Sequence, residues 1–92
     1  MPSLVNLAEL RYQVLDRCFS DKTRYYFIDT LLKAVNKALR NDGWKEISER
    51  TLWNTIKEME NNPNWNVVLT NKKKDGRRYF RYEDPSYSIY RQ

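Results

Sequence analysis

Positively charged side chains are concentrated in one short stretch of this chain. Residues 71–82, NKKKDGRRYFRY, contain six cations and one acid. The whole chain has 17 basic and 12 acidic residues, so 11 of each lie elsewhere and the net charge of +5 belongs entirely to this stretch. Charge concentrated in this way indicates a contact surface for a polyanion. The six cations are Lys72, Lys73, Lys74, Arg77, Arg78 and Arg81.

A second group of side chains suited to a polyanion lies on the helix predicted for residues 48–60. Ser48 is a good N-cap, because its hydroxyl can accept from a free backbone N–H of the first turn. Leu52, Ile56 and Met59 follow at helical spacing and form an apolar stripe. An ordinary amphipathic helix with a solvated polar face would show the same pattern. The opposite face carries groups that can reach phosphates and base edges, at Arg50, Asn54, Lys57 and Asn61, with Trp53 at its edge.

The composition bounds the class of protein. A chain of 92 residues is expected to form one domain, residues 1–92, with a small core. Aromatic residues make up 14% of the chain, too many for a disordered basic tail. Cys18 is the single cysteine, so no internal disulfide can form, and a cytoplasmic, nucleoid-associated location is expected. No apolar run approaches the ~20 residues of a membrane span, and no signal-peptide pattern is present.

Two further helices are predicted before residue 48. The first covers residues 7–19 after Asn6 as cap, with Asp16 among its solvent-facing residues. The second covers residues 28–40 and ends at Asn41-Asp42-Gly43. The connector 44–47 has room for one short strand. The aromatic trio 25–27 is either a stacking platform for bases or a cover for the edge of the core, and the second interpretation is favoured.

A β-hairpin is predicted after the breaker cluster at residues 61–64. Residues 65–70 and 77–83 have the character of strands, and Asp75-Gly76 between them is the signal for a type I′ turn. In that register Lys74 faces Arg77 and Thr70 faces Arg81. Like charges at the tip repel one another, and a phosphate partner would relieve that cost. One face near the base is apolar and can pack on the helices, through Val67, Leu69, Phe80 and Tyr82.

This order of elements predicts an α+β winged helix-turn-helix, with a three-helix core and a C-terminal two-stranded β-hairpin wing. In that architecture the third helix enters the major groove of double-stranded DNA, and the wing reaches the backbone or the adjacent minor groove. The expected DNA-binding residues are Ser48, Arg50, Thr51, Trp53, Asn54, Lys57, Lys72, Lys73, Lys74, Arg77 and Arg78.

Three motifs also resemble a known family. Residues 10–19, LRYQVLDRCF, resemble the "RYxVIDRCL" opening of the N-terminal domain of WYL-domain transcriptional regulators, as found in Bacteroides-type bacteria. Residues 48–52, SERTL, resemble that family's "SxRTV" at the start of its recognition helix. Residues 79–89, YFRYEDPSYSI, resemble its "YYxYxDPDYSI" close. The three motifs occur in the family's order and together cover nearly the whole chain.

The resemblance implies a winged helix-turn-helix DNA-binding domain of a bacterial transcriptional regulator. In the family, a WYL domain thought to sense a ligand follows this domain, so residues 84–92 are expected to be a tail or a linker to a downstream domain absent from this chain. The residues themselves leave three roles open for this tail: packing back on the domain, mediating a homodimer, or linking.

Other classes of function are less well supported. An enzyme is not expected, because the chain has no histidine and Cys18 falls on a predicted core face without a base beside it. No metal-ligand spacing or glycine-rich loop is present, so no catalytic residue, metal or cofactor is assigned. The main alternative is a winged helix module that binds an acidic protein without specific DNA binding. Binding of double-stranded RNA through the wing is a weaker third candidate.

Overall fold

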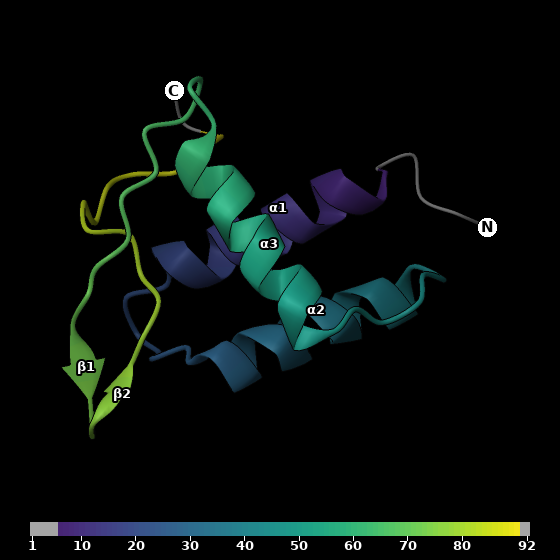
Figure 1. The fold of residues 1–92 in the computed structure, drawn as a ribbon, viewed down its shortest axis with the longest axis horizontal. Helices are drawn as coiled ribbons and strands as arrows, with labels where there is room; N and C mark the ends of the chain where they lie inside the picture. Colours follow the sequence, from purple (N-terminus) through teal and green to yellow (C-terminus); the bar gives the residue numbers. More distant parts are fainter. Residues whose placement is uncertain (1–5, 91–92) are drawn as a thin grey trace.

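The computed structural model describes residues 6–90 and contains three helices followed by a small antiparallel hairpin (Figure 1). The helices are α1 (Leu7–Ser20), α2 (Ile28–Asn41) and α3 (Glu49–Asn61), and the strands are β1 (Lys73–Lys74) and β2 (Arg77–Arg78). Each helix packs against the other two. The α+β class, the order of elements and all three helices agree with the prediction. The helix limits differ from the predicted ones by one residue at most.

The helix ends follow from the capping residues that the sequence indicated. The Asn6 side chain accepts a hydrogen bond from the Glu9 backbone N–H at 2.8 Å, and Ser48 Oγ accepts one from Thr51 N–H at 3.2 Å. After α2, Gly43 takes a φ of +81°, which glycine adopts without a steric cost. Its N–H donates to the Arg40 carbonyl at 3.1 Å and closes the end of the helix.

The core is formed by the apolar stripes of the three helices and by the base of the hairpin. Leu52, Ile56 and Met59 of α3 are fully buried, as predicted. Burial raises the pKa of the Cys18 thiol to about 11, so this side chain is a neutral part of the core at physiological pH. The remaining buried apolar residues are Val14, Leu15, Phe19, Leu31, Val35, Leu39, Val67, Leu69, Phe80, Tyr82 and Ile89.

The connector before α3 contains no strand at residues 44–48. The backbone groups of Ile47 bond to a side chain and not to a neighbouring strand. Asn36 Nδ2 donates to the Ile47 carbonyl at 3.1 Å, and the Ile47 N–H donates to Asn36 Oδ1 at 2.8 Å. Asn36 is itself buried on α2. Since both backbone groups of Ile47 are bonded to α2, this contact sets the point where α3 begins.

The hairpin has the predicted register but much shorter strands. Lys74 pairs with Arg77, the Thr70 N–H donates to the Arg81 carbonyl at 2.9 Å, and an isolated bridge joins Leu69 to Tyr82. Asp75 and Gly76 have φ of 54° and 80°, as a type I′ turn requires. The expected strands 65–70 and 77–83 are therefore wrong in length, although their pairing is right.

The strand lengths have a physical reason. Alternate backbone groups of residues 79–83 bond to the last turn of α1 and to the segment between α1 and α2, and not to residues 67–72 of the hairpin. The Phe80 N–H donates to the Tyr26 carbonyl at 2.8 Å, and the Tyr82 N–H donates to the Phe19 carbonyl at 3.0 Å. Residues 79–83 thus lie between two neighbours, each bonded at a few points. We refer to residues 67–83 as the hairpin and to residues 19–29 as its docking segment.

Asp16 corrects the prediction for α1, because it is buried and not solvent-facing; only 8% of its surface is exposed. Its carboxylate accepts hydrogen bonds from the Tyr82 hydroxyl at 2.7 Å, from Ser88 Oγ at 2.8 Å and from the Ile89 N–H at 3.0 Å. Burial, and then the bond to Asp16, raise the pKa of the Tyr82 phenol, so it remains a donor. Helical periodicity suggested exposure because it took no account of the distant chain that covers this position.

The same carboxylate explains where the tail goes. Ile89 is buried, and the Tyr90 hydroxyl donates to Glu9 Oε1 on α1 at 2.6 Å. Residues 84–90 thus pack back on the domain, one of the three roles left open for the tail, and the dimer and linker roles stay predictions. Residues 91–92 of the predicted tail lie outside the described residues, and a downstream domain stays a prediction.

Replacing Asp16 with Ala should release the tail. The change leaves buried donors without an acceptor, which costs about 1–3 kcal/mol of the free energy of unfolding. The Ile89 amide, bonded to Asp16, should then exchange its hydrogen faster relative to the core amides. Urea unfolding and hydrogen exchange measure the two effects, with Asp21→Ala as control because the Asp21 carboxylate bonds to residues 23 and 24 beside it in the chain and not to the tail. Unchanged exchange at Ile89 would show that Asp16 does not hold the tail.

Candidate nucleic-acid interface

The polar face of α3 is free to meet a partner. Arg50, Asn54 and Lys57 are all exposed. No hydrogen bond or ion pair within residues 6–90 engages their side chains. They lie on one side of the helix at intervals of four and three residues, so the three can touch one surface together. Their types supply a guanidinium, an amide and an ammonium, which suit phosphates and base edges.

Ser48 and Thr51 stabilise the start of α3. Ser48 Oγ caps the helix by accepting from the Thr51 N–H, and the two hydroxyl oxygens are 3.2 Å apart. Ser48 is exposed and Thr51 is half-buried. Both residues therefore shape the first turn, which positions Arg50, and Ser48 keeps its surface access beside it.

Trp53 joins α3 to the hairpin. Its ring is half-buried and meets the ring of Phe80 edge-on, with centroids 5.6 Å apart and planes at 67°. A small hollow of about 150 Å³ remains beside this contact, lined also by Ile28, Arg77 and Arg78. The sequence left Trp53 with two roles, a contact to a base or a cover for the wing; this structure has it covering the base of the hairpin.

The cations of the hairpin fall into two groups. Lys72 and Lys73 are exposed, and within the described chain no hydrogen bond, ion pair or ring contact engages their side chains. The other group lies over aromatic rings: Lys74 Nζ is 5.1 Å from the Tyr25 ring centre, and the Arg78 guanidinium is 4.6 Å from that of Phe80. Such contacts hold a cation by the negative face of the ring and reduce its freedom to turn outward.

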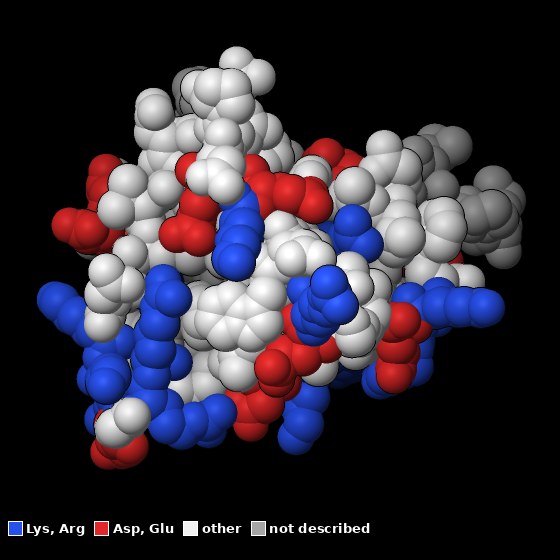
Figure 2. Space-filling view, in the orientation of Figure 1, with Lys and Arg blue, Asp and Glu red and all other residues white. Residues whose placement is uncertain are grey.

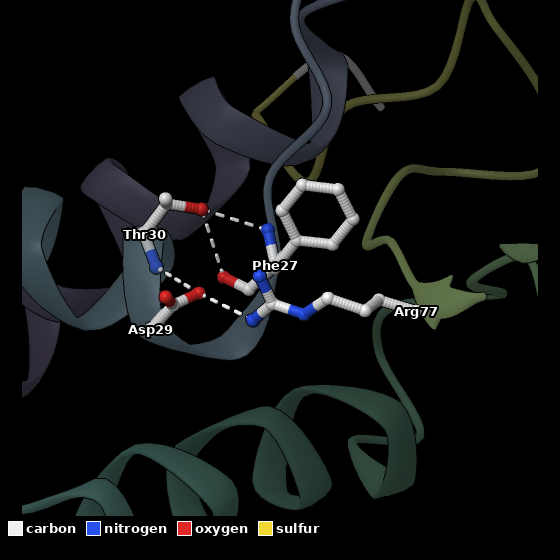
Figure 3. Close-up of polar contacts among 4 residues, drawn as sticks. All are labelled: Phe27, Asp29, Thr30 and Arg77. Carbon is white, nitrogen blue, oxygen red and sulfur yellow. Dashed lines mark hydrogen bonds and ion pairs between the residues drawn. The ribbon is translucent and has the colours of Figure 1, made fainter. Parts of the chain in front are cut away.

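Arg77 is the most firmly held cation at the tip. Its Nη2 donates to Asp29 Oδ1 at 2.8 Å, and its guanidinium lies 4.5 Å from the centre of the Phe27 ring. Figure 3 shows the side chain reaching from β2 to the start of α2, with the ring on one side and the carboxylate at its end. The bond from Arg77 holds the pKa of the Asp29 carboxyl below its usual range.

Hydrogen bonds at the start of α2 hold the two groups that contact Arg77. Thr30 Oγ1 accepts from the Phe27 N–H at 2.7 Å and donates to the Phe27 carbonyl at 3.0 Å (Figure 3). Thr30 N–H also donates to Asp29 Oδ1 at 3.0 Å. These bonds fix the ring and the carboxylate relative to each other, so they define one position for the tip of the hairpin.

Arg81 completes the attachment to the docking segment. Its Nη2 donates to the Arg24 carbonyl at 2.8 Å, and its guanidinium lies 4.7 Å from the Tyr25 ring and 5.2 Å from the Tyr79 ring. The aromatic trio 25–27 therefore contacts the hairpin and helps to attach it. Tyr25 remains 43% exposed. The sequence analysis did not identify Asp29 as the partner of Arg77 or Arg24 as the partner of Arg81. The one signal for such contacts was an aromatic trio in a chain whose predicted hairpin is rich in arginine.

The face that carries α3 and the hairpin has an uneven charge. Lys and Arg cover the hairpin at the lower left of Figure 2, and Asp and Glu lie both around the upper, C-terminal end of α3 and in the lower centre, near its start. Two of these acids, Glu58 and Glu60, are exposed, and Glu58 accepts from the Tyr12 hydroxyl at 3.0 Å. A polyanion is therefore attracted mainly to the hairpin and repelled from the C-terminal end of α3, while at the start of α3 exposed Glu49 offsets the charge of Arg50.

Comparison of the chain with protein-family models, curated proteins and solved structures finds no match. The resemblance to WYL-domain regulators therefore stays a prediction. None of the helices in residues 6–90 has the length and apolar character needed to cross a bilayer. That same part of the chain has no group of three or more His, Cys, Asp or Glu side chains that could hold a metal ion.

The Asp29–Arg77 pair gives a testable pH dependence. Because the pKa of Asp29 is lowered in the folded protein, the pair stabilises the docked tip above the unfolded-state pKa of an aspartate. That contribution is lost as the pH falls through the lowered pKa. Titration of the Asp29 carboxyl by NMR should give a higher pKa in Arg77→Ala than in the wild type, and Lys73→Ala should leave it unchanged. Equal values for Arg77→Ala and the wild type would show that the pair does not form in solution.

Proposed function

We propose that this protein binds double-stranded DNA as the winged helix-turn-helix domain of a bacterial transcriptional regulator. In this proposal α3 enters the major groove, and the hairpin is the wing, on the backbone or in the adjacent minor groove. The observation that carries the proposal is that the unengaged polar face of α3 and the basic hairpin are joined side by side through Trp53 and Phe80. One duplex can then meet both surfaces at once.

In this proposal the side chains of α3 and those of the hairpin contact different parts of the DNA. Arg50 lies in the first turn of α3, from which groove-inserted helices make most of their base contacts, and its guanidinium can pair bidentately with guanine. Asn54 lies one turn later and suits adenine, and Lys57 suits a phosphate or a guanine. Lys72 and Lys73, exposed and unengaged, suit phosphates and carry no sequence information. Lys74, Arg77 and Arg78 orient the hairpin and add to its positive field.

The resemblance of the three sequence motifs supports a regulator of the WYL type, with a ligand-sensing domain downstream. A cytoplasmic protein near the nucleoid and a homodimer on a two-fold symmetric site are parts of the same proposal. The alternative is an acidic protein partner. DNA is favoured over it by Asn54, because the amide offers a donor and an acceptor together, which match the edge of adenine, whereas a carboxylate uses only the donor.

The direct experiment is selection of bound sequences from a random duplex pool, followed by titration of the winner at several salt concentrations. DNA binding predicts an enriched sequence and a steep linear fall of log K with log salt. A protein-interaction module would enrich no sequence. Enrichment of double-stranded RNA over DNA of the same sequence would place the protein in a different class.

Removing the two unengaged lysines, Lys72 and Lys73, should weaken binding to every duplex by a similar factor. In Lys72→Ala/Lys73→Ala each lost phosphate contact should reduce the magnitude of the salt slope by about 0.9, or about 1.8 in total. The control Arg40→Ala/Lys45→Ala removes the same net charge from the end of α2 and the connector after it, outside the hairpin, where Arg40 pairs with Glu46, and should keep the wild-type slope. Binding titrations across salt measure both. A slope unchanged in the Lys72/Lys73 variant would mean that the hairpin is not on the DNA.

Arg50 should carry sequence preference. Arg50→Ala should cost about 1–3 kcal/mol of binding free energy on the preferred duplex and flatten the preference at one base pair. Arg50→Lys keeps the charge but loses the bidentate geometry, so it should restore little of the discrimination. Titration against the preferred duplex and its single-base variants at fixed salt measures this. Full recovery of affinity and discrimination by Arg50→Lys would assign Arg50 to a phosphate.

A further inference from the structure

A second group of cations lies in a groove that α3 does not reach. The groove has a volume of about 510 Å³ and runs between α1, the docking segment and α2. Its lining contains no residue of α3 or of residues 65–90, and no carboxylate. Four of the lining side chains are cations, Arg17, Arg24, Lys33 and Lys37.

The side chains of these four cations have no bonded partner in the described chain. All are exposed, and within residues 6–90 their side chains form no hydrogen bond or ion pair. The carboxylate nearest in sequence to Arg24 is Asp21, whose Oδ1 accepts from both the N–H and the hydroxyl of Thr23. The pKa of Asp21 is lowered mainly by these bonds and to a smaller extent by the charge of Arg24, so Asp21 and Arg24 attract each other without forming an ion pair. Four like charges around one hollow repel one another, and a bound anion would relieve that repulsion.

The groove adjoins the hairpin at one end. The carbonyl of Arg24, whose side chain lines the groove, accepts from Arg81 of the hairpin. Thr30, another lining residue, stands next to Asp29, which holds Arg77. The hairpin and the groove therefore meet at Arg24 and at the start of α2, and farther along α2 the groove is lined by Lys33 and Lys37, one turn apart.

The lining favours a nucleic-acid backbone over a protein partner. The centre of a protein interface is usually an exposed aromatic or other large apolar side chain. In the described chain such exposed side chains are Tyr25, Val68 and Tyr90, and none of them lines the groove. The apolar residues that do line it, Tyr26, Ala34 and Ala38, are half-buried, so the exposed side chains of the groove are mainly its cations. Exposed cations give salt-dependent attachment to phosphates, independent of sequence.

We propose that this groove binds backbone phosphates of duplex DNA that flanks the sequence contacted by α3. The inference rests on the proposed DNA-binding function and extends its footprint: the backbone passes the hairpin and continues along Arg24, Lys33, Lys37 and Arg17. The groove adds affinity on long DNA and no base preference. A duplex covering only the central sequence ends before it reaches the groove.

The test compares two duplexes that share the selected central sequence. One covers this sequence alone, and the other is extended on each side by about one helical turn, roughly 10 base pairs. Salt slopes are measured for the wild type, for Lys33→Ala/Lys37→Ala, and for the control Arg40→Ala/Lys45→Ala, which removes the same charge outside the groove. All the substituted side chains are exposed, so equal melting temperatures verify that each variant folds.

The wild type should have a steeper slope on the extended duplex than on the short one. Lys33→Ala/Lys37→Ala should lose about 1.8 of slope on the extended duplex and keep the wild-type slope on the short one, because each phosphate contact contributes about 0.9. The control should match the wild type on both. Base preference, measured with single-base variants of the central sequence, should be unchanged in the groove variant.

Three outcomes would overturn the inference. Equal slopes for the wild type and the groove variant on the extended duplex would show that the groove does not touch flanking DNA. An equal loss on both duplexes would assign the groove to the central site. Binding of polyglutamate that disappears in the groove variant, while DNA binding is kept, would make an acidic protein the occupant. Failure of the proposed function is distinct, because then neither duplex binds the wild type.

Discussion

The hairpin cannot hold itself, and the candidate interface depends on how it is docked. Its strands have two residues each, and an isolated two-stranded hairpin is at best marginally stable in water. Backbone bonds from Phe80 and Tyr82 to the docking segment, together with the Trp53–Phe80 ring contact, fix it against all three helices. The surfaces that we propose for DNA are therefore arranged before binding, which reduces the ordering cost of association.

Docking also determines which cations remain available. The arginines serve as anchors, because a planar guanidinium can lie on a ring and donate sideways at the same time. Arg77 does this with Phe27 and Asp29, and Arg81 with two tyrosines and the Arg24 carbonyl. Lys72 and Lys73 are left as unengaged point charges. A count of charges at the tip alone would overstate the number of phosphates that the hairpin can neutralise.

Local signals in the sequence were enough for the helices, their caps, the register and the buried stripes, because each depends on residues a few positions apart. The missed features depend on distant chain. Asp16 is buried by Ser88 and Ile89, more than 70 residues away, and the strands are short because Tyr26 and Phe19 take bonds from residues 80 and 82. The basic groove was missed because its cations alternate along the chain with acids such as Asp21 and Asp29, which lie outside its lining.

The central claim is that one duplex contacts α3 and the hairpin together, and the amide NMR spectrum of the protein with its selected duplex tests it most directly. The account predicts the largest shift changes at residues 49–57 of α3 and 71–78 of the hairpin, with little change at residues 84–90 of the tail. A scrambled duplex of equal length should perturb the hairpin and leave the first turn of α3 nearly unchanged. Changes confined to the tail and α1, or an identical response to both duplexes, would contradict the account.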